Sequence, residues 1–168
     1  MIFLTVPLAP TGAWAEPAIQ TPVQLGEPEA SVRQKLGEPS KVVDSSGDTI
    51  LWYMSQGFSL DIDPTTKTVQ AITLMGSYRG EGWESYSGKV VSDINLSASI
   101  DQFIQVLGSS YEKDELMEEM GVTDTSTFYW GFETYTLGSE FWTRDYNQNG
   151  QTYPKGSIKT IEISKKGS

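Results

Sequence analysis

The chain has 168 residues, of which 22 are acidic and 12 are basic, and its formal net charge is −10. This charge argues against nucleic acid and anionic membrane surfaces as partners, because both are negatively charged. The chain has no cysteine and no histidine, which excludes disulfides, thiolate nucleophiles, a Ser-His-Asp triad and a histidine-ligated zinc site. The acidity favours either solubility alone or a basic partner.

The first 15 residues, MIFLTVPLAPTGAWA, carry no charged side chain and contain an apolar run at 2–8. Residues 13–15 then give the small-residue pattern of a signal-peptide cleavage site. We predict that 1–15 is a signal-peptide remnant without its basic start, and the alternative is a plain apolar tail. The protein is then expected to be periplasmic or secreted, with a mature chain that begins at Glu16. No other stretch approaches the ~18–20 apolar residues of a membrane span.

The stretch 25–42, LGEPEASVRQKLGEPSKV, predicts a short helix followed by the first strand of a sheet. Pro28 suits the first turn of a helix, and Gly37 suits the left-handed cap that ends one. Apolar and polar residues then alternate between turn sequences, which predicts an antiparallel meander. The expected strands cover 41–44, 49–54, 58–62 and 69–74.

A similar stretch returns at 96–111, LSASIDQFIQVLGSSY, and at a constant offset Leu107 and Gly108 match the Leu-Gly end of the first helix. Ser99 and Gln102 can form a capping box at the start of the second helix. These matches predict an internal repeat. Further alternating strands are expected within 128–132, 139–144 and 157–163.

An acidic segment at 114–124, DELMEEMGVTD, has no counterpart in the first copy. We interpret it as an inserted, solvated helix, and the alternative is a docking segment for a basic partner. Residues 145–150, DYNQNG, match the first half of a calcium loop, but the glutamate that such a loop needs at its twelfth position is replaced by Gly156. We interpret this segment as an Asn-Gly hairpin turn, with weak calcium binding as the alternative.

The motif LGEPEASVRQKLGEPSKVV, followed by a Trp-Tyr strand, an alternating strand and TVQAITL, resembles the helix-plus-meander module of the β-lactamase inhibitory protein. It is also similar to the small outer-membrane assembly lipoproteins of the SmpA/OmlA (BamE-like) group. The resemblance spans residues 23–163, although Ser109 and Ser110 stand where the second copy should have its proline.

The fold implied by this resemblance is α+β, with two tandem helix-plus-antiparallel-meander units and the helices on one face of an antiparallel sheet. The expected organisation is a signal remnant at 1–15, a first unit at 16–75, a linker at 76–88 and a second unit at 89–164 that carries the insertion.

The function implied is that of a secreted, non-enzymatic protein–protein interaction module, either inhibitor-like or an accessory in envelope assembly. An aromatic sheet face and a hairpin would contact a partner whose identity the sequence does not give. The residues expected to do so are Asp48, Trp52, Tyr53, Tyr129, Trp130, Phe141 and Trp142. Side chains alternate along a strand, and the pattern does not say which of Trp52 and Tyr53 points outward.

The alternative function is glycan or small-ligand binding by the same aromatic side chains. No cofactor, metal or membrane insertion is expected. Carboxylate pairs such as Asp61 with Asp63, or Glu133 with Glu140, are interpreted as accidental in so acidic a chain, so no enzymatic activity is expected either.

Overall fold

The computed structural model describes residues 16–45, 47–76, 82–114, 124–148 and 150–167. The predicted signal remnant and most of the predicted acidic insertion lie outside these residues. The elements in chain order are α1 (Glu29–Leu36), β1 (Lys41–Ser45), β2 (Asp48–Tyr53), a 3-10 helix η1 (Met54–Gln56), β3 (Phe58–Ile62), β4 (Val69–Met75), β5 (Lys89–Val91), β6 (Ile94–Asn95), α2 (Ile100–Leu107), β7 (Glu112–Lys113), β8 (Thr125–Gly131), β9 (Tyr135–Trp142), β10 (Tyr146–Gln148), β11 (Gln151–Tyr153) and β12 (Ile158–Lys165). No helix in the described ranges is long and apolar enough to cross a membrane.

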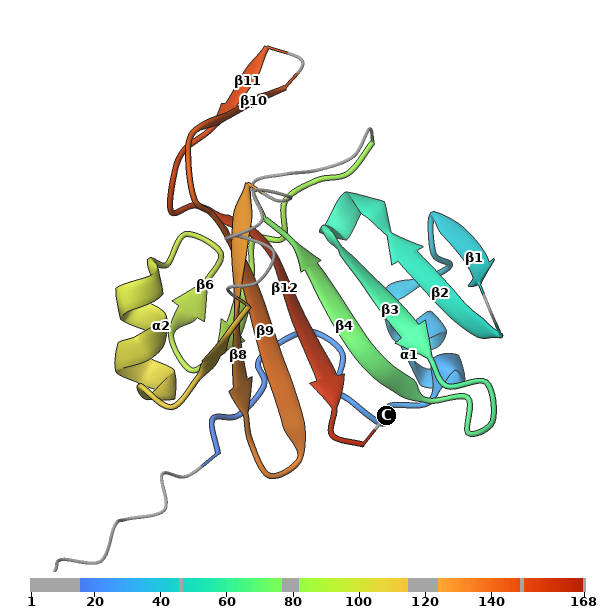
Figure 1. The fold of residues 1–168 in the computed structure, drawn as a ribbon. Coiled ribbons are helices and arrows are strands. Elements are labelled where there is room, and N and C mark those ends of the chain that lie inside the picture. Colours follow the sequence, from blue (N-terminus) through green and yellow to red (C-terminus); the bar gives the residue numbers. More distant parts are fainter. Residues whose placement is uncertain (1–15, 46, 77–81, 115–123, 149, 168) are drawn as a thin grey trace, which may run out of the picture.

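The described strands build one large antiparallel sheet of eight strands in the order β1-β2-β3-β4-β12-β9-β8-β7 (Figure 1). The last strand of the chain, β12, lies in the middle of this sheet, where Ile161 is opposite both Leu74 of β4 and Ser139 of β9. The β10–β11 hairpin projects from the body, and β5 and β6 form a separate small ribbon.

The predicted fold class of two tandem helix-plus-meander units is therefore wrong. The chain is mostly β, and eight of the described strands, from both before and after the predicted linker at 76–88, belong to one sheet. Alternation of apolar and polar residues identifies a strand but does not say which strand it pairs with. Strand β4 belongs to the predicted first unit, 16–75, and β12 to the predicted second unit, 89–164. Because these two strands pair, both predicted units contribute strands to the same sheet.

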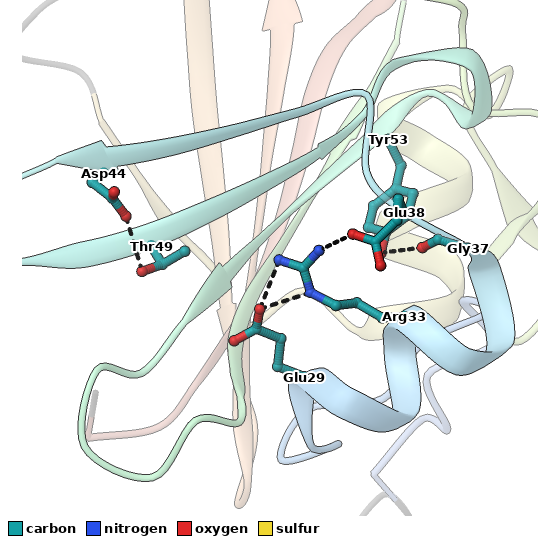
Figure 2. A network of polar contacts seen from close by, with 7 residues as sticks. All are labelled: Glu29, Arg33, Gly37, Glu38, Asp44, Thr49 and Tyr53. Atoms are coloured by element: carbon teal, nitrogen blue, oxygen red, sulfur yellow. Dashed lines mark hydrogen bonds and ion pairs between the residues drawn. The ribbon is translucent and has the colours of Figure 1, made fainter.

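Helix α1 has Val32 as its only buried residue. Figure 2 shows polar contacts within this helix, at its end and from the sheet. Arg33 forms an ion pair at 2.8 Å with Glu29, one turn earlier, and a second with Glu38. The Tyr53 hydroxyl of β2 donates a hydrogen bond of 3.2 Å to the carbonyl of Gly37, where the helix ends.

Helix α2 is amphipathic and buries Phe103 and Leu107 against the sheet. The predicted capping box is present: the Ser99 side chain accepts from the Gln102 backbone, and the Gln102 side chain accepts from the Ser99 backbone. The helix ends at Gly108, with φ of 92°. The carbonyl of Gly108 accepts a hydrogen bond of 3.0 Å from Nε1 of Trp130 in β8.

Strand alternation gives the sheet two different faces. The core face packs against both helices and carries the buried apolar side chains, among them Leu51, Tyr53, Phe58, Leu60, Ile62, Ile72, Leu74, Trp130, Leu137, Phe141, Ile161 and Ile163. The opposite face has neither helix on it, and we call it the open face. Its side chains, which follow from the strand registers, include Ile50, Trp52, Ser59, Asp61, Thr73, Met75, Thr127, Tyr129, Glu140, Trp142, Thr160 and Glu162.

Candidate functional site

The open face carries a hollow of about 480 Å³ over β2, β3, β4 and β12. It is lined by Ile50, Trp52, Ser59, Asp61, Thr73, Met75, Trp83, Glu140, Lys159 and Thr160. The two tryptophan rings contact each other, with centroids 5.4 Å apart and an interplanar angle of 53°. The Lys41 ammonium lies 4.8 Å from the centroid of the Trp52 ring. One side of the hollow is therefore aromatic.

Trp83 reaches the open face on a short segment between β4 and β5. Two backbone hydrogen bonds of 2.9 Å hold the residues that follow the tryptophan, from Glu84 N to the Met54 carbonyl and from Tyr86 N to the Met75 carbonyl. Tyr86 is buried and packs edge-on against Phe58 of the core face. The segment therefore links the core to the open face, and its anchoring fixes where Trp83 lies.

A second aromatic cluster lies at the base of the β10–β11 hairpin. The Trp142 ring stacks on Tyr146, with centroids 4.6 Å apart and planes within 8°, and on Tyr153 at 5.7 Å. The Lys159 ammonium is 5.6 Å from the same indole. Trp142 is only 5% exposed, so its main role is to fix the hairpin on the sheet.

Two carboxylates on the open face have opposite surroundings. Glu140 accepts hydrogen bonds from Thr125 Oγ1 at 2.6 Å, Lys159 Nζ at 2.9 Å and Thr160 Oγ1 at 3.1 Å. For Asp61, burial and the nearby charges of Glu162 and Asp48 raise the pKa above its ordinary value. Within the described ranges, no cation or hydrogen-bond donor offsets these effects at Asp61.

Replacing Asp61 with asparagine is expected to stabilise the protein at neutral pH. A carboxyl whose pKa is raised on folding makes the folded state bind more protons than the unfolded state between the two pKa values. Stability therefore falls as pH rises through that window, and the full cost is present above the folded pKa. Urea unfolding of both proteins should show the gain of Asp61→Asn at pH 7 and its disappearance below the ordinary aspartate pKa of about 3.9. Asp48→Asn changes an exposed neighbour of Asp61 and should gain less stability. An equal or larger gain from Asp48→Asn would mean that the unfavourable charge is not that of Asp61.

The structure separates the predicted contact residues by sheet face. Tyr53, Trp130 and Phe141, which were predicted to contact a partner, point into the core instead, where each is at most 4% exposed. They sit there because register pairs them with other core-face positions, Tyr53 with Phe58 and Trp130 with Leu137.

The remaining predicted residues lie on or beside the open face. Trp52 lines the hollow, and Trp142 anchors the hairpin. Tyr129 is 41% exposed and lies against Gly138, where its ring carbon Cε1 is 3.1 Å from the place that a Cβ would occupy. Asp48 is exposed at the start of β2, in the hairpin that follows β1.

Sequence reasoning did not identify Trp83, Lys159 or Met75 as members of a site. Trp83 lies in a glycine-rich stretch that was expected to be a linker, and the aromatic residues of that stretch were the available signal. From the sequence, Glu140 is notable only as half of an accidental pair with Glu133. Glu133 lies in the turn before β9 and Glu140 near the far end of that strand, so they form no pair.

The predicted hairpin at 145–150 is confirmed, because β10 and β11 pair across it. Asp145 accepts a hydrogen bond of 2.8 Å from Lys155 N, and Asn147 accepts one of 2.6 Å from Thr152 Oγ1. Side-chain oxygens that would bind calcium in a calcium loop therefore accept hydrogen bonds that stabilise the hairpin. Residue 149 lies outside the described residues. Where the structure describes the chain, it has no group of three or more acidic, cysteine or histidine side chains that could hold a metal ion.

Comparison with known proteins assigns no family to this chain. No family model matches it, and no curated protein matches it. Among solved structures it is similar to an extracellular protein containing an SCP domain from Bacillus anthracis str. Ames, with a TM-score of 0.45 and 10% sequence identity over 84% of this chain. The chain spans 44% of the length of that structure.

Proposed function

We propose that this protein is a secreted or periplasmic, non-enzymatic module that binds another protein through the open face of its sheet. The observation that carries the proposal is the placement of Trp52 and Trp83 on the face that neither helix covers, where they form one side of a hollow. The solvated face of an antiparallel sheet is normally polar. Tryptophan and tyrosine on such a face are typical of protein interfaces, because they give a large contact area at low entropic cost.

Charge supports a basic partner. The open face carries Asp61 and Glu162 close together, and the whole chain has a net charge of −10. A partner with a positive surface would be attracted over several ångströms and oriented before contact. The uncharged, apolar 15 residues before Glu16 support export from the cytoplasm. The partner would be either a hydrolase that the module inhibits or a component of envelope assembly.

The test is a capture experiment followed by affinity measurement. Immobilised protein is exposed to extract of its own cell envelope, the captured proteins are identified by mass spectrometry, and the main one is purified. Trp52→Ala is expected to weaken that complex about 30-fold or more, as for other interface hot spots of about 2 kcal/mol. Val42→Ala, which truncates a 46% exposed side chain on the other face of adjacent β1, is the control and should bind as the wild type does. Equal affinity of wild type and Trp52→Ala would exclude the open face as the binding surface.

Glycan binding is the second candidate, and the exposure of Tyr129 favours it, because its ring has a surface on which a sugar can stack. The Trp142 ring, in contrast, is already stacked on Tyr146 and Tyr153, so it is not available to a sugar in the same way. Retention of the protein on peptidoglycan or polysaccharide resin, reduced by Tyr129→Ala and unchanged by Trp52→Ala, would favour a glycan. Capture of a protein with the reverse mutational pattern would favour the first proposal.

A further inference from the structure

The hollow on the open face combines aromatic surface with a carboxylate for which the described residues provide no partner. Trp52 and Trp83 form one side, and Ile50 and Met75 add apolar surface beside them. Asp61 shares this hollow. In the β2–β3 register Asp61 is paired with Ile50 and is one diagonal step from Trp52, so carboxylate and indole rise from neighbouring positions on the same face.

The negative charge of Asp61 is not compensated within the described part of the chain. It shares its surroundings with Glu162 of β12 and Asp48 of β2, which are both acidic. Two lysines beside the hollow are engaged elsewhere: Lys159 pairs with Glu140 at 2.9 Å, and Lys41 lies over the Trp52 ring. A cation that entered the hollow would therefore relieve a charge conflict rather than compete with an existing ion pair.

The composition of the hollow selects an organic cation over a metal ion. Among the described residues, no group of three or more acidic, cysteine or histidine side chains is placed to hold a metal ion. The tryptophan side of the hollow also offers none of the oxygen ligands that calcium and magnesium prefer. Aromatic rings instead attract cations through their faces, and the Lys41 ammonium above Trp52 is an example from this site. A guanidinium group suits such a place better than an ammonium, because it is planar, weakly hydrated and able to stack on an indole while donating to a carboxylate.

The hydroxyl groups in the hollow can complete the recognition of that cation. Ser59 and Thr73 lie opposite each other in the β3–β4 register and line the same hollow as Asp61. A guanidinium carries five N–H donors, and one carboxylate accepts at most a pair of them in the forked geometry. Hydroxyl oxygens beside the carboxylate can accept from the others. The hollow thus provides both stacking surface and acceptors.

We infer that this hollow receives an arginine side chain of the partner protein, stacked on the tryptophan pair with its guanidinium at Asp61. The inference rests on the proposed function, because it names the group that the partner inserts. A protein side chain is the source that the geometry favours: the hollow lies on a sheet face, where the chain that carries the arginine can run across the neighbouring strands.

The test measures binding of small probes by isothermal titration calorimetry, independently of any partner. The probes are acetyl-Gly-Arg-Gly-amide, its norleucine analogue, and agmatine as a free guanidinium compound. The arginine peptide is expected to bind in the millimolar range, and Asp61→Asn should weaken this binding at least tenfold. Trp83→Ala, which removes one ring without changing a strand, should weaken it about fivefold or more. The control Asp101→Asn, which removes an exposed carboxylate of α2 on the other side of the sheet, should bind the peptide as the wild type does.

Several outcomes would overturn the inference. One is that the wild type does not bind the arginine peptide at 20 mM probe. A second is that Asp61→Asn binds this peptide as tightly as the wild type does. A third is that the wild type binds the norleucine analogue as tightly as the arginine peptide, which would indicate that the hollow recognises apolar surface only. Agmatine binding as tight as the peptide would assign the site to a free cation instead of a protein side chain. Asp61→Asn should fold at least as stably as wild type, so a loss of binding cannot be ascribed to unfolding.

The same variants separate this inference from the function on which it rests. If the captured partner loses affinity with Trp52→Ala but keeps it with Asp61→Asn, the open face binds a protein and the arginine assignment is wrong. If the arginine peptide binds as expected but the captured partner is indifferent to both variants, the hollow recognises guanidinium and the proposed interface is wrong.

Discussion

Replacing Trp130 with alanine is expected to lower the free energy of unfolding by about 3–5 kcal/mol, the range found when a large aromatic side chain is removed from a core. Trp130 is fully buried in β8, and its ring lies 5.7 Å from that of Phe103 in α2. Its indole N–H also donates to the carbonyl of Gly108 at the end of that helix. Truncation would therefore open a cavity beneath α2 and leave a helix-terminal carbonyl without its partner.

Tyr129→Ala is the matched control, because Tyr129 is the adjacent residue on the opposite face of the same strand and is 41% exposed. It should cost about 1 kcal/mol or less, as surface substitutions do. Trp130→Phe should fall between the two, since it keeps most of the apolar volume and loses the hydrogen bond, worth about 1–3 kcal/mol when the acceptor is left buried. Urea unfolding followed by circular dichroism measures all three. A cost for Trp130→Ala no greater than that for Tyr129→Ala would mean that β8 presents the opposite face to the core.

This pair of residues also shows what the sequence could predict about the site. The alternation Phe128, Trp130, Phe132 identified a strand with two different faces, and β8 is such a strand. Alternation is symmetric, however: it separates the two sets of side chains without saying which set meets the core. That choice is made by the strands on either side and by the helix that covers one face, so Tyr53, Trp130 and Phe141 could not be assigned from their own segments.

Helices were predicted more successfully than sheet pairing because their signals are local. Gly37 and Gly108 both end helices with positive φ, and Ser99 caps α2 with Gln102 as expected. Strand pairing depends on residues far apart in the chain. Nothing within β12 indicates that it pairs with β4, more than 80 residues earlier, and this pairing turns the expected separate units into one sheet. Trp83 was missed for the same reason, since it joins Trp52 only after the sheet has formed.

Replacing Gly57 with alanine is expected to destabilise the protein by about 2–5 kcal/mol, from left-handed backbone strain and from overpacking together. Gly57 ends η1 with φ of 77°. A Cβ on it would lie 2.3 Å from Tyr86 N and 2.6 Å from the Ser85 carbonyl carbon. These are backbone atoms that cannot rotate away, so the segment that carries Trp83 would have to move.

Gly37→Ala is a comparison variant that has backbone strain but no collision. Gly37 also has a positive φ, 82°, but its ψ of −171° lies outside the left-handed helical region that Gly57 occupies, and a Cβ there would meet nothing within 4 Å. Its cost should be backbone strain alone, of about 1–3 kcal/mol. If urea unfolding shows that Gly57→Ala costs no more than the left-handed strain of about 1–2 kcal/mol, the close approach of residues 85 and 86 to Gly57 does not contribute to the loss.

The Gly57→Ala variant also tests whether the anchoring of Trp83 matters for binding. Under conditions where the variant remains folded, displacement of its segment should separate the two indoles and change the near-ultraviolet circular dichroism that their 5.4 Å contact contributes. Binding of acetyl-Gly-Arg-Gly-amide should then weaken as much as in Trp83→Ala, while Gly37→Ala, on the helix side of the sheet, should bind the peptide as the wild type does. A folded Gly57→Ala protein with wild-type peptide affinity would mean that the hollow does not depend on this segment, and that Asp61 and Trp52 recognise the cation without it.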